Sequence, residues 1–248
     1  MKKIIFFVCL MLGFSNCEKP GDCVKSTGSI VSKQFDGLTF NKIIVNKGIS
    51  LEITQGDVYK VEVRTGENLI NDIQVTVVGD MLVLEDMTSC NWVRDYGQTI
   101  VYVTAPNLTD IYCKTEKEIK SNGVLRYQSL HVVSGDSADG YNGAGMGDIA
   151  LQLHNESVTI ECNNVSRFFL SGTTTNLSVN FYEGGGIFYG ENMIAEKVHV
   201  FHRGSNDMFV HPINEINGDI YNIGNVYSLN HPPIVNVIEH YQGRLIFY

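Results

Sequence analysis

The sequence predicts an all-β fold, specifically a right-handed parallel β-helix (solenoid) with rungs of about 20 residues. In most segments apolar residues alternate with polar ones, which is the period of a strand and not of a helix. After residue 110 strand-like segments recur, because Val158, Leu177 and Val198 are 19 and then 21 residues apart. Such a repeat is typical of a chain whose equivalent strands stack in parallel, and parallel crossovers are almost always right-handed.

The composition is that of a folded domain. Of the 248 residues, 44% are hydrophobic and 18% are charged, which suffices to bury a core and excludes general disorder. The chain has 27 acidic side chains against 18 Lys and Arg, giving a formal net charge of -9. Because a basic surface supplies most of the affinity for nucleic acid, we expect no nucleic-acid partner.

The N-terminus has the form of an export signal. Two lysines precede an apolar run over residues 4–12, which is too short to span a bilayer as a helix. We therefore expect a signal peptide over residues 1–16. No later stretch approaches 18 apolar residues, so the sequence predicts no membrane-spanning helix in the mature chain.

The residues after the apolar run decide how the signal is removed. The segment from Gly13 to Cys17 resembles the lipobox of bacterial lipoproteins, in which Cys17 is acylated and becomes the first residue. Ordinary cleavage after Ser15 is the alternative. With acylation, residues 17–34 form a tether and membrane lipid is a partner through Cys17. The protein is then held at the outer membrane or cell surface, or faces the periplasm. Residues 35–248 form one domain.

The first part of that domain, residues 35–87, reads as short alternating strands separated by glycine-containing turns. Gly48, Gly66 and the pair Gly79-Asp80 mark three of these turns. The inward positions expected from the alternation are Ile43, Val45, Ile49, Leu51, Ile53, Tyr59, Val61, Val63, Ile73, Val75, Val77, Leu82 and Leu84.

The second part, residues 110–248, carries the repeat in three columns. The first holds Val158, Leu177 and Val198, the second Phe168, Ile187 and Met208, and the third Phe169, Phe188 and Phe209. The second and third columns are adjacent in sequence, so they must face opposite sides of the strands. If the column of Phe169, Phe188 and Phe209 faces outward, it is an exposed aromatic stack typical of a binding face. Alternatively, another layer of the protein covers it.

A glycine-rich segment, residues 135–147, interrupts the repeat and is expected to project as a loop. Calcium binding there lacks the spacing of known calcium loops, and phosphate binding lacks a following helix. The tripeptide Asp136-Ser137-Ala138 resembles an O-glycan acceptor of some exported bacterial proteins. The residues of this possible binding loop are Asp136, Ser137, Asp139, Tyr141 and Asn142.

We expect no catalytic residues, no metal site and no cofactor. The Gly-x-Ser-x-Gly motif of hydrolases does not occur, and on a strand His199 and His202 face opposite sides. Asp207, Glu161 and Arg203 lie near the repeated strands and are the candidates for a polysaccharide-cleaving site.

Of the cysteines, Cys113 and Cys162 are in phase with apolar strand residues, which indicates buried thiols. Cys23 and Cys90 lie beside loops, where a disulfide remains an alternative in an oxidising compartment. The pairing among these four cysteines stays open.

Several segments together carry a family resemblance: Gln34-Phe35-Asp36-Gly37, Phe40 to Val45, Ile49 to Ile53, Val61-Glu62-Val63, Asn68-Leu69, Met81 to Leu84, Val101-Tyr102-Val103 with Pro106-Asn107-Leu108, and Gly218 to Gly224. They resemble one family of exported bacterial proteins, the putative auto-transporter adhesin, head GIN domain family. The likeness covers most of residues 35–248. It implies a parallel β-helix, commonly held at the membrane as a lipoprotein, and brings no established catalytic residues.

Together these observations predict a non-enzymatic lipoprotein of the cell envelope that acts in adhesion or binds surface components, with carbohydrate or protein as partner. The alternative is a polysaccharide-binding or polysaccharide-cleaving protein on the same fold. A purely structural envelope protein is a third reading.

Overall fold

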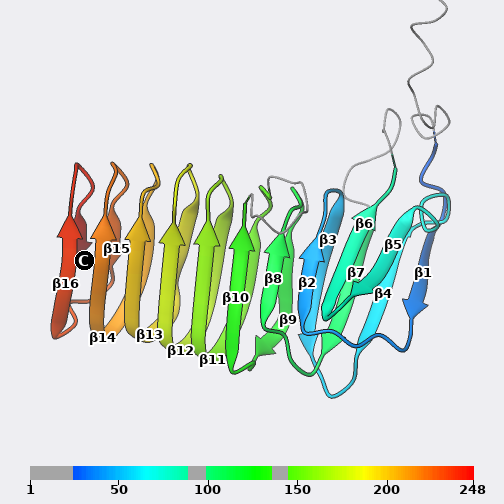
Figure 1. Cartoon of the computed structure of the whole chain (residues 1–248), viewed down its shortest axis with the longest axis horizontal. Coiled ribbons are helices and arrows are strands. Elements are labelled where there is room, and N and C mark those ends of the chain that lie inside the picture. Colours follow the sequence, from blue (N-terminus) through cyan, green and yellow to red (C-terminus); the bar gives the residue numbers. More distant parts are fainter. Residues whose placement is uncertain (1–24, 89–98, 136–144) are drawn as a thin grey trace, which may run out of the picture.

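The computed structural model describes residues 25–88, 99–135 and 145–248, which form one mixed sheet of seventeen strands (Figure 1). No helix occurs in these three ranges, and so none that is long and apolar enough to cross a membrane. The strands are β1 (Ile30–Phe35), β2 (Lys42–Val45), β3 (Ile49–Gln55), β4 (Lys60–Gly66), β5 (Ile73–Val78), β6 (Met81–Asp86), β7 (Thr99–Ala105), β8 (Asp110–Cys113), β9 (Ile119–Leu125), β10 (Ser129–Ser134), β11 (Ile149–Cys162), β12 (Arg167–Phe181), β13 (Ile187–His202), β14 (Met208–Ile220), β15 (Val226–Ser228), β16 (Ile234–Glu239) and β17 (Leu245–Phe247).

The strands form two rows around one core. The first row runs β1, β4, β7, β3, β9, the N-terminal halves of β11 to β14, then β15 and β17. The second runs β5, β6, β2, β8, β10, the C-terminal halves of β11 to β14, then β16. Across the core Phe168 of the first row meets Phe181 of the second, with ring centroids 5.7 Å apart. Because β11 to β14 pass through both rows, the sheet is nearly closed.

The expected right-handed parallel β-helix with rungs of about 20 residues is wrong as a description of this fold. The sheet is mixed, because β1 pairs with β4, β4 with β7 and β5 with β6 in antiparallel orientation. One physical reason is visible in the sequence. Only Gly79 and Asp80 join β5 to β6, and a link of two residues joins antiparallel strands but is too short for a parallel crossover.

The stacking of equivalent positions in the later strands is confirmed. Val158 of β11 lies opposite Leu177 of β12, and Leu177 lies opposite Val198 of β13, all in parallel pairs. The three side chains are buried. Residues about twenty positions apart are therefore neighbours at the inter-strand spacing of about 4.8 Å.

Two glycines permit the close packing of these long strands. Gly172 in β12 has φ +112° and Gly218 in β14 has φ +130°. A Cβ at either position would lie 1.9 Å from a carbonyl oxygen, that of Leu153 or Val200. Both positions therefore require glycine for backbone angle and for space.

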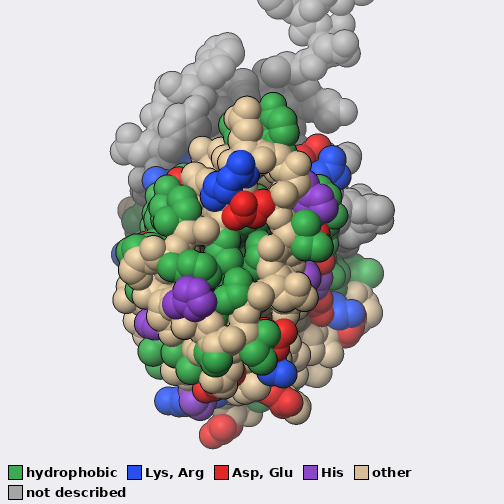
Figure 2. Space-filling model, turned by 90° about the vertical axis from the view of Figure 1, so that its left-hand side faces the viewer, with side chains coloured by type: hydrophobic (Ala, Val, Ile, Leu, Met, Phe, Trp, Pro, Cys, Tyr) green, Lys and Arg blue, Asp and Glu red, His purple; other side chains and the backbone are tan. Residues whose placement is uncertain are grey.

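The C-terminal end of the sheet is open. Figure 2 views this end and shows apolar side chains gathered on it. β16 has β14 as its only strand partner in the described part of the sheet, and its Ile234, Val235 and Ile238 are exposed. The core beneath remains closed, since Ile216, Ile220 and Val226 are fully buried.

At the other end, the ordered sheet begins before the expected domain boundary at residue 35. β1 starts at Ile30, inside the segment expected to be a tether, and pairs along its whole length with β4. Cys17, Cys23, Cys90 and the possible binding loop, Asp136 to Asn142, lie outside the described residues.

Candidate binding face

Five aromatic side chains stack along the outside of the first row, and we call them the aromatic ladder: Phe169, Tyr189, Phe209, Tyr227 and Tyr248. The first four rings are nearly parallel, with interplanar angles of 8°, 4° and 13° and centroids 4.9, 5.7 and 5.2 Å apart. Tyr248 meets Tyr227 edge-on at 6.0 Å. The ring faces therefore cover one another along the ladder, and an uncovered face is expected only where the ladder ends.

The predicted column of Phe169, Phe188 and Phe209 is wrong at its middle member. Phe188 is fully buried and lies opposite Phe168 and Met208 in the core. Tyr189 occupies the outward position between Phe169 and Phe209. Of the three predicted members, Phe169 and Phe209 lie on the outer side of the sheet with Tyr189, and Phe169 is 39% exposed.

The ladder ends at β11 because a small residue follows Phe169 in the register. Ala150 lies opposite Phe169, and Lys120 of β9 lies opposite Ala150 on its other side. A methyl group thus stands where the next ring of the ladder would be. Above it lies a shallow groove of about 600 Å³, which we call the ladder slot, lined by Lys120, Ser121, Ala150, Leu151, Gln152, Phe169, Leu170, Ser171, Tyr189, Glu191 and Asn192.

Two irregularities in strand pairing border the ladder slot. The pairing of β9 with β11 shifts register between Ala150 and Gln152, and that of β12 with β13 shifts between Phe169 and Ser171. Such bulges redirect side chains and are common beside functional sites. Here they bring Ser121 and Asn192 into the lining, and the Ser121 hydroxyl accepts a hydrogen bond of 2.8 Å from the backbone N–H of Gln152.

Around the ladder slot, three carboxylates surround one lysine. Lys120 Nζ lies 3.5 Å from Glu52 Oε2 and 3.7 Å from Glu118 Oε2, and Glu191 adds a third carboxylate to the rim. The Arg167 guanidinium lies over the Phe169 ring, with its carbon atom 5.8 Å from the ring centroid. That guanidinium is neutralised by Asp148, to which it donates from both Nε and Nη2.

The ladder slot continues into a second, smaller groove of about 260 Å³. The two share Gln152 and Ser171. The extension adds Val124, Arg126, His154 and Thr173, and His154 Nδ1 is 2.6 Å from the Thr173 hydroxyl. Together the two grooves form one trough, lined by apolar and polar side chains, across the outside of β9, β11, β12 and β13.

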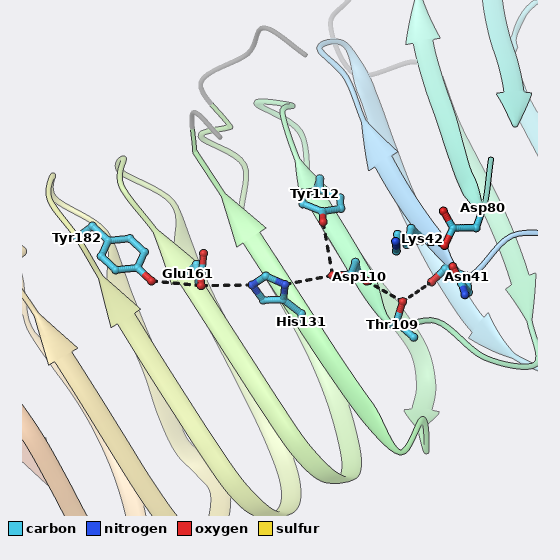
Figure 3. Close-up of polar contacts among 9 residues, drawn as sticks. All are labelled: Asn41, Lys42, Asp80, Thr109, Asp110, Tyr112, His131, Glu161 and Tyr182. Carbon is cyan, nitrogen blue, oxygen red and sulfur yellow. Dashed lines mark hydrogen bonds and ion pairs between the residues drawn. The ribbon is translucent and has the colours of Figure 1, made fainter. Parts of the chain in front are cut away.

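A second aromatic strip runs along the outside of the other row: Tyr182, Phe201, Tyr221 and His240. Neighbouring centroids are 5.6, 5.3 and 4.1 Å apart. The strip continues into a line of polar contacts that crosses β11, β10 and β8 (Figure 3). The contacts are Tyr182 Oη to Glu161 Oε1 at 3.2 Å, His131 Nε2 to Glu161 Oε1 at 3.6 Å, His131 Nδ1 to Asp110 Oδ1 at 3.1 Å, and Thr109 Oγ1 to Asp110 Oδ2 at 2.7 Å.

This polar line does not have the geometry of a catalytic dyad. A general base needs one imidazole nitrogen on a carboxylate and the other on a nucleophile or substrate. In His131 both nitrogens face carboxylates, those of Asp110 and Glu161, and Nε2 is buried without a hydrogen bond. We read the line as a structural link between neighbouring strands.

The three candidates for polysaccharide cleavage have separate partners in the structure. Glu161 accepts from Tyr182, Asp207 Oδ1 accepts from the backbone N–H of Asn225 at 2.9 Å, and the Arg203 backbone donates to Phe181. No hydrogen bond or ion pair joins the three residues, all of which lie within the described ranges.

Cys113 and Cys162 are buried free thiols, as the sequence predicted. Burial raises the pKa of Cys113, and it raises the pKa of Cys162 to about 11. Both are therefore protonated and unreactive at neutral pH. His199 and His202 face opposite sides of β13, also as predicted, with His199 exposed and His202 buried.

The fold and its outer face define the class of this protein: an all-β domain on a nearly closed mixed sheet. The chain belongs to the family described as "Putative auto-transporter adhesin, head GIN domain", whose model matches residues 39–232. Among proteins with curated descriptions, none matches the chain.

Solved structures share this fold at low sequence identity. A putative adhesin from Bacteroides fragilis is 19% identical with a TM-score of 0.80, covering 90% of this chain and 99% of its own. A putative adhesin from Parabacteroides distasonis is 15% identical with a TM-score of 0.65 and the same coverage. A protein from the same species described as a putative lipid binding protein is 12% identical, with a TM-score of 0.63, and covers 89% of this chain and 98% of its own.

Proposed function

We propose that this chain is an exported, lipid-anchored, non-enzymatic protein of the cell envelope that binds components of a cell surface. The observation that carries the proposal is the aromatic ladder. Its rings stand on the outside of five consecutive turns of the chain, and Phe169 and Tyr248 are 39% and 60% exposed. Tyr189, Phe209 and Tyr227 between them are half-buried. A row of aromatic side chains on the outer side of a folded domain is typical of a binding face.

The family and the N-terminus support the remaining parts of the proposal. The family is described as a putative adhesin, and the first residues have the form of an export signal over residues 1–16 followed by Cys17. An acylated Cys17 would hold the domain at a membrane surface, since each buried methylene of an acyl chain contributes about 0.8 kcal/mol.

Attachment of protein-coated beads tests the binding function. Beads carrying the purified domain are expected to attach to mucin-coated surfaces or cultured epithelial cells more than beads carrying albumin. Beads carrying a Phe169→Ser, Tyr189→Ser variant are expected to attach less. Attachment no better than that of albumin beads would remove the binding function.

Two further measurements test the anchor and the absence of catalysis. Mass spectrometry of the native protein is expected to show an acylated Cys17, and an unmodified N-terminus would contradict it. Incubation with host and bacterial polysaccharides is expected to release no reducing or unsaturated ends. Their appearance would favour the polysaccharide-cleaving alternative.

A further inference from the structure

We propose that the ladder slot binds one neutral pyranose ring of a surface glycan, stacked on Phe169 above Ala150. This inference rests on the proposed surface-binding function and names its site and ligand class. Its starting point is the interruption of the aromatic ladder, where a stack of regularly spaced rings stops at a methyl group.

The width of the slot above Ala150 fits a single ring. Phe169 and Lys120 flank Ala150 in the register, so their backbones are two inter-strand spacings apart, about 9.6 Å. A ring placed at the spacing seen between Phe169 and Tyr189, 4.9 Å, lies directly above Ala150. It fills the space between the Phe169 face and the Lys120 side chain.

The chemistry of the lining fits a sugar better than an apolar ring. A pyranose has an apolar C–H face that packs on an aromatic ring and hydroxyl groups around its edge that require hydrogen-bond partners. The slot offers the Phe169 ring, which is 39% exposed, and a rim of hydroxyl, amide and charged groups. The rim groups are Lys120, Ser121, Gln152, Ser171, Glu191 and Asn192.

The charge of the slot selects a neutral sugar. Lys120 is already paired with Glu52 and Glu118, and Glu191 stands on the rim. A carboxylate on the ligand would meet these three acids across a short distance, and like charges in contact are disfavoured. Uronic acids and sialic acids are therefore expected to bind more weakly than neutral hexoses.

The trough beyond the slot indicates a longer glycan and not a free monosaccharide. Arg126, His154 and Thr173 continue the polar lining past Gln152. A second sugar unit linked to the first would lie along this extension, where hydrogen bonds are available but no aromatic face is present.

A glycan array printed with neutral and acidic oligosaccharides tests the inference, followed by calorimetry with the best neutral oligosaccharide on the array. The decisive variant is Ala150→Phe, which adds the missing ring to the ladder and fills the slot. We expect it to weaken binding at least ten-fold while its melting temperature stays the same or rises. Phe169→Leu is expected to weaken binding similarly, because it removes the stacking face.

Phe201→Leu is the matched control. It also removes one outward aromatic ring from β13, but this ring belongs to the second aromatic strip on the other row and lies outside the slot lining, so the affinity of this variant should stay within two-fold of the original protein. Absence of binding to any neutral glycan, preference for acidic glycans, or unchanged affinity of Ala150→Phe would each overturn the inference.

The bead assay separates this inference from the proposed function. If beads carrying Ala150→Phe attach as well as those carrying the original protein, the slot is not the binding site, while surface binding stands. If neither attaches, the surface-binding function itself fails.

Discussion

His202 makes the fold sensitive to acid. Its side chain is fully buried beside Phe181, with ring centroids 6.1 Å apart in an edge-on arrangement. Neither ring nitrogen has a hydrogen-bond partner, although the nearby Asn206 backbone and the charge of Asp207 both favour the protonated form. Burial lowers the pKa of His202 from 6.5 to about 4, because a charged imidazole is poorly solvated there.

The sign of the effect follows from proton binding. Between pH 6.5 and pH 4 the unfolded chain binds a proton at His202 and the folded chain does not. The free energy of unfolding contributed by this residue is therefore fully present above pH 6.5 and is lost as the pH falls through this window. The difference between the two pKa values corresponds to about 3 kcal/mol at most.

Urea denaturation followed by circular dichroism at pH 7, 6, 5 and 4 measures this loss. Comparison with His202→Leu isolates the contribution of His202 from other acid effects. The variant should lose about 3 kcal/mol less than the original protein over this range. At pH 7 it should be at least as stable, because the substitution removes two unpaired buried nitrogens, each costing about 1 to 3 kcal/mol.

The control is His199→Leu, which changes the exposed histidine on the same strand and should leave the pH profile unchanged. Parallel pH profiles for the original protein and His202→Leu would refute the reasoning.

Three further predictions concern the glycine, tyrosine and cysteine positions. Gly172 has φ +112°, and a Cβ there would lie 1.9 Å from a carbonyl oxygen, so Gly172→Ala should destabilise the fold by at least about 3 kcal/mol. Gly79 has φ +64° and open space around it, so Gly79→Ala should destabilise the fold by only about 1 kcal/mol. Equal losses of stability in urea denaturation would contradict this. Tyr127→Phe removes the buried hydrogen bond from the Tyr127 hydroxyl to the Ala105 carbonyl, 3.2 Å long, and should cost about 1 kcal/mol; a more stable variant would show that the hydroxyl is not satisfied. Cys113 and Cys162 should resist alkylation at pH 8 until the protein is unfolded, and rapid labelling of either in the native state, located by peptide mass spectrometry, would show that they are not buried.

The strands were predictable where alternation is clean. Residues 43, 45, 49, 51 and 53 were expected to point inward, and the structure buries all of them. The direction of pairing was not predictable from alternation, because period two is the same in parallel and antiparallel sheets. The two-residue link at Gly79-Asp80 was the available signal for an antiparallel hairpin.

The aromatic ladder was predictable in part. Ile187, Phe188 and Tyr189 are three apolar residues in a row, so alternation alone does not decide which of them faces outward. The register between β12 and β13 shifts along the strands. Paired residues are 20 positions apart in sequence at Phe169 and Tyr189, but 21 positions apart at Leu177 and Val198. A bulge of this kind cannot be seen in the spacing of repeated residues, so a constant spacing of 21 wrongly selects Phe188 instead of Tyr189.

The end of the ladder is also marked in the sequence by a small residue. Ala150 precedes Phe169 by the same 19 residues that separate Val158 from Leu177. Ala150 is therefore the position before Phe169 in the same column, and it is the small residue that opens the slot. The polar rim depends on bulges in β9 and β13 and follows only from the three-dimensional structure.

The central claim is that the interrupted ladder is the binding site. The most direct test is an NMR methyl spectrum of the protein labelled with ¹³C at alanine. The spectrum is recorded with and without the best neutral oligosaccharide. Ala150 is the alanine in the slot, whereas Ala105 and Ala195 are fully buried. We predict a shift of the Ala150 methyl signal, with Ala105 and Ala195 unchanged. Binding of the oligosaccharide without any change at Ala150 would contradict the account.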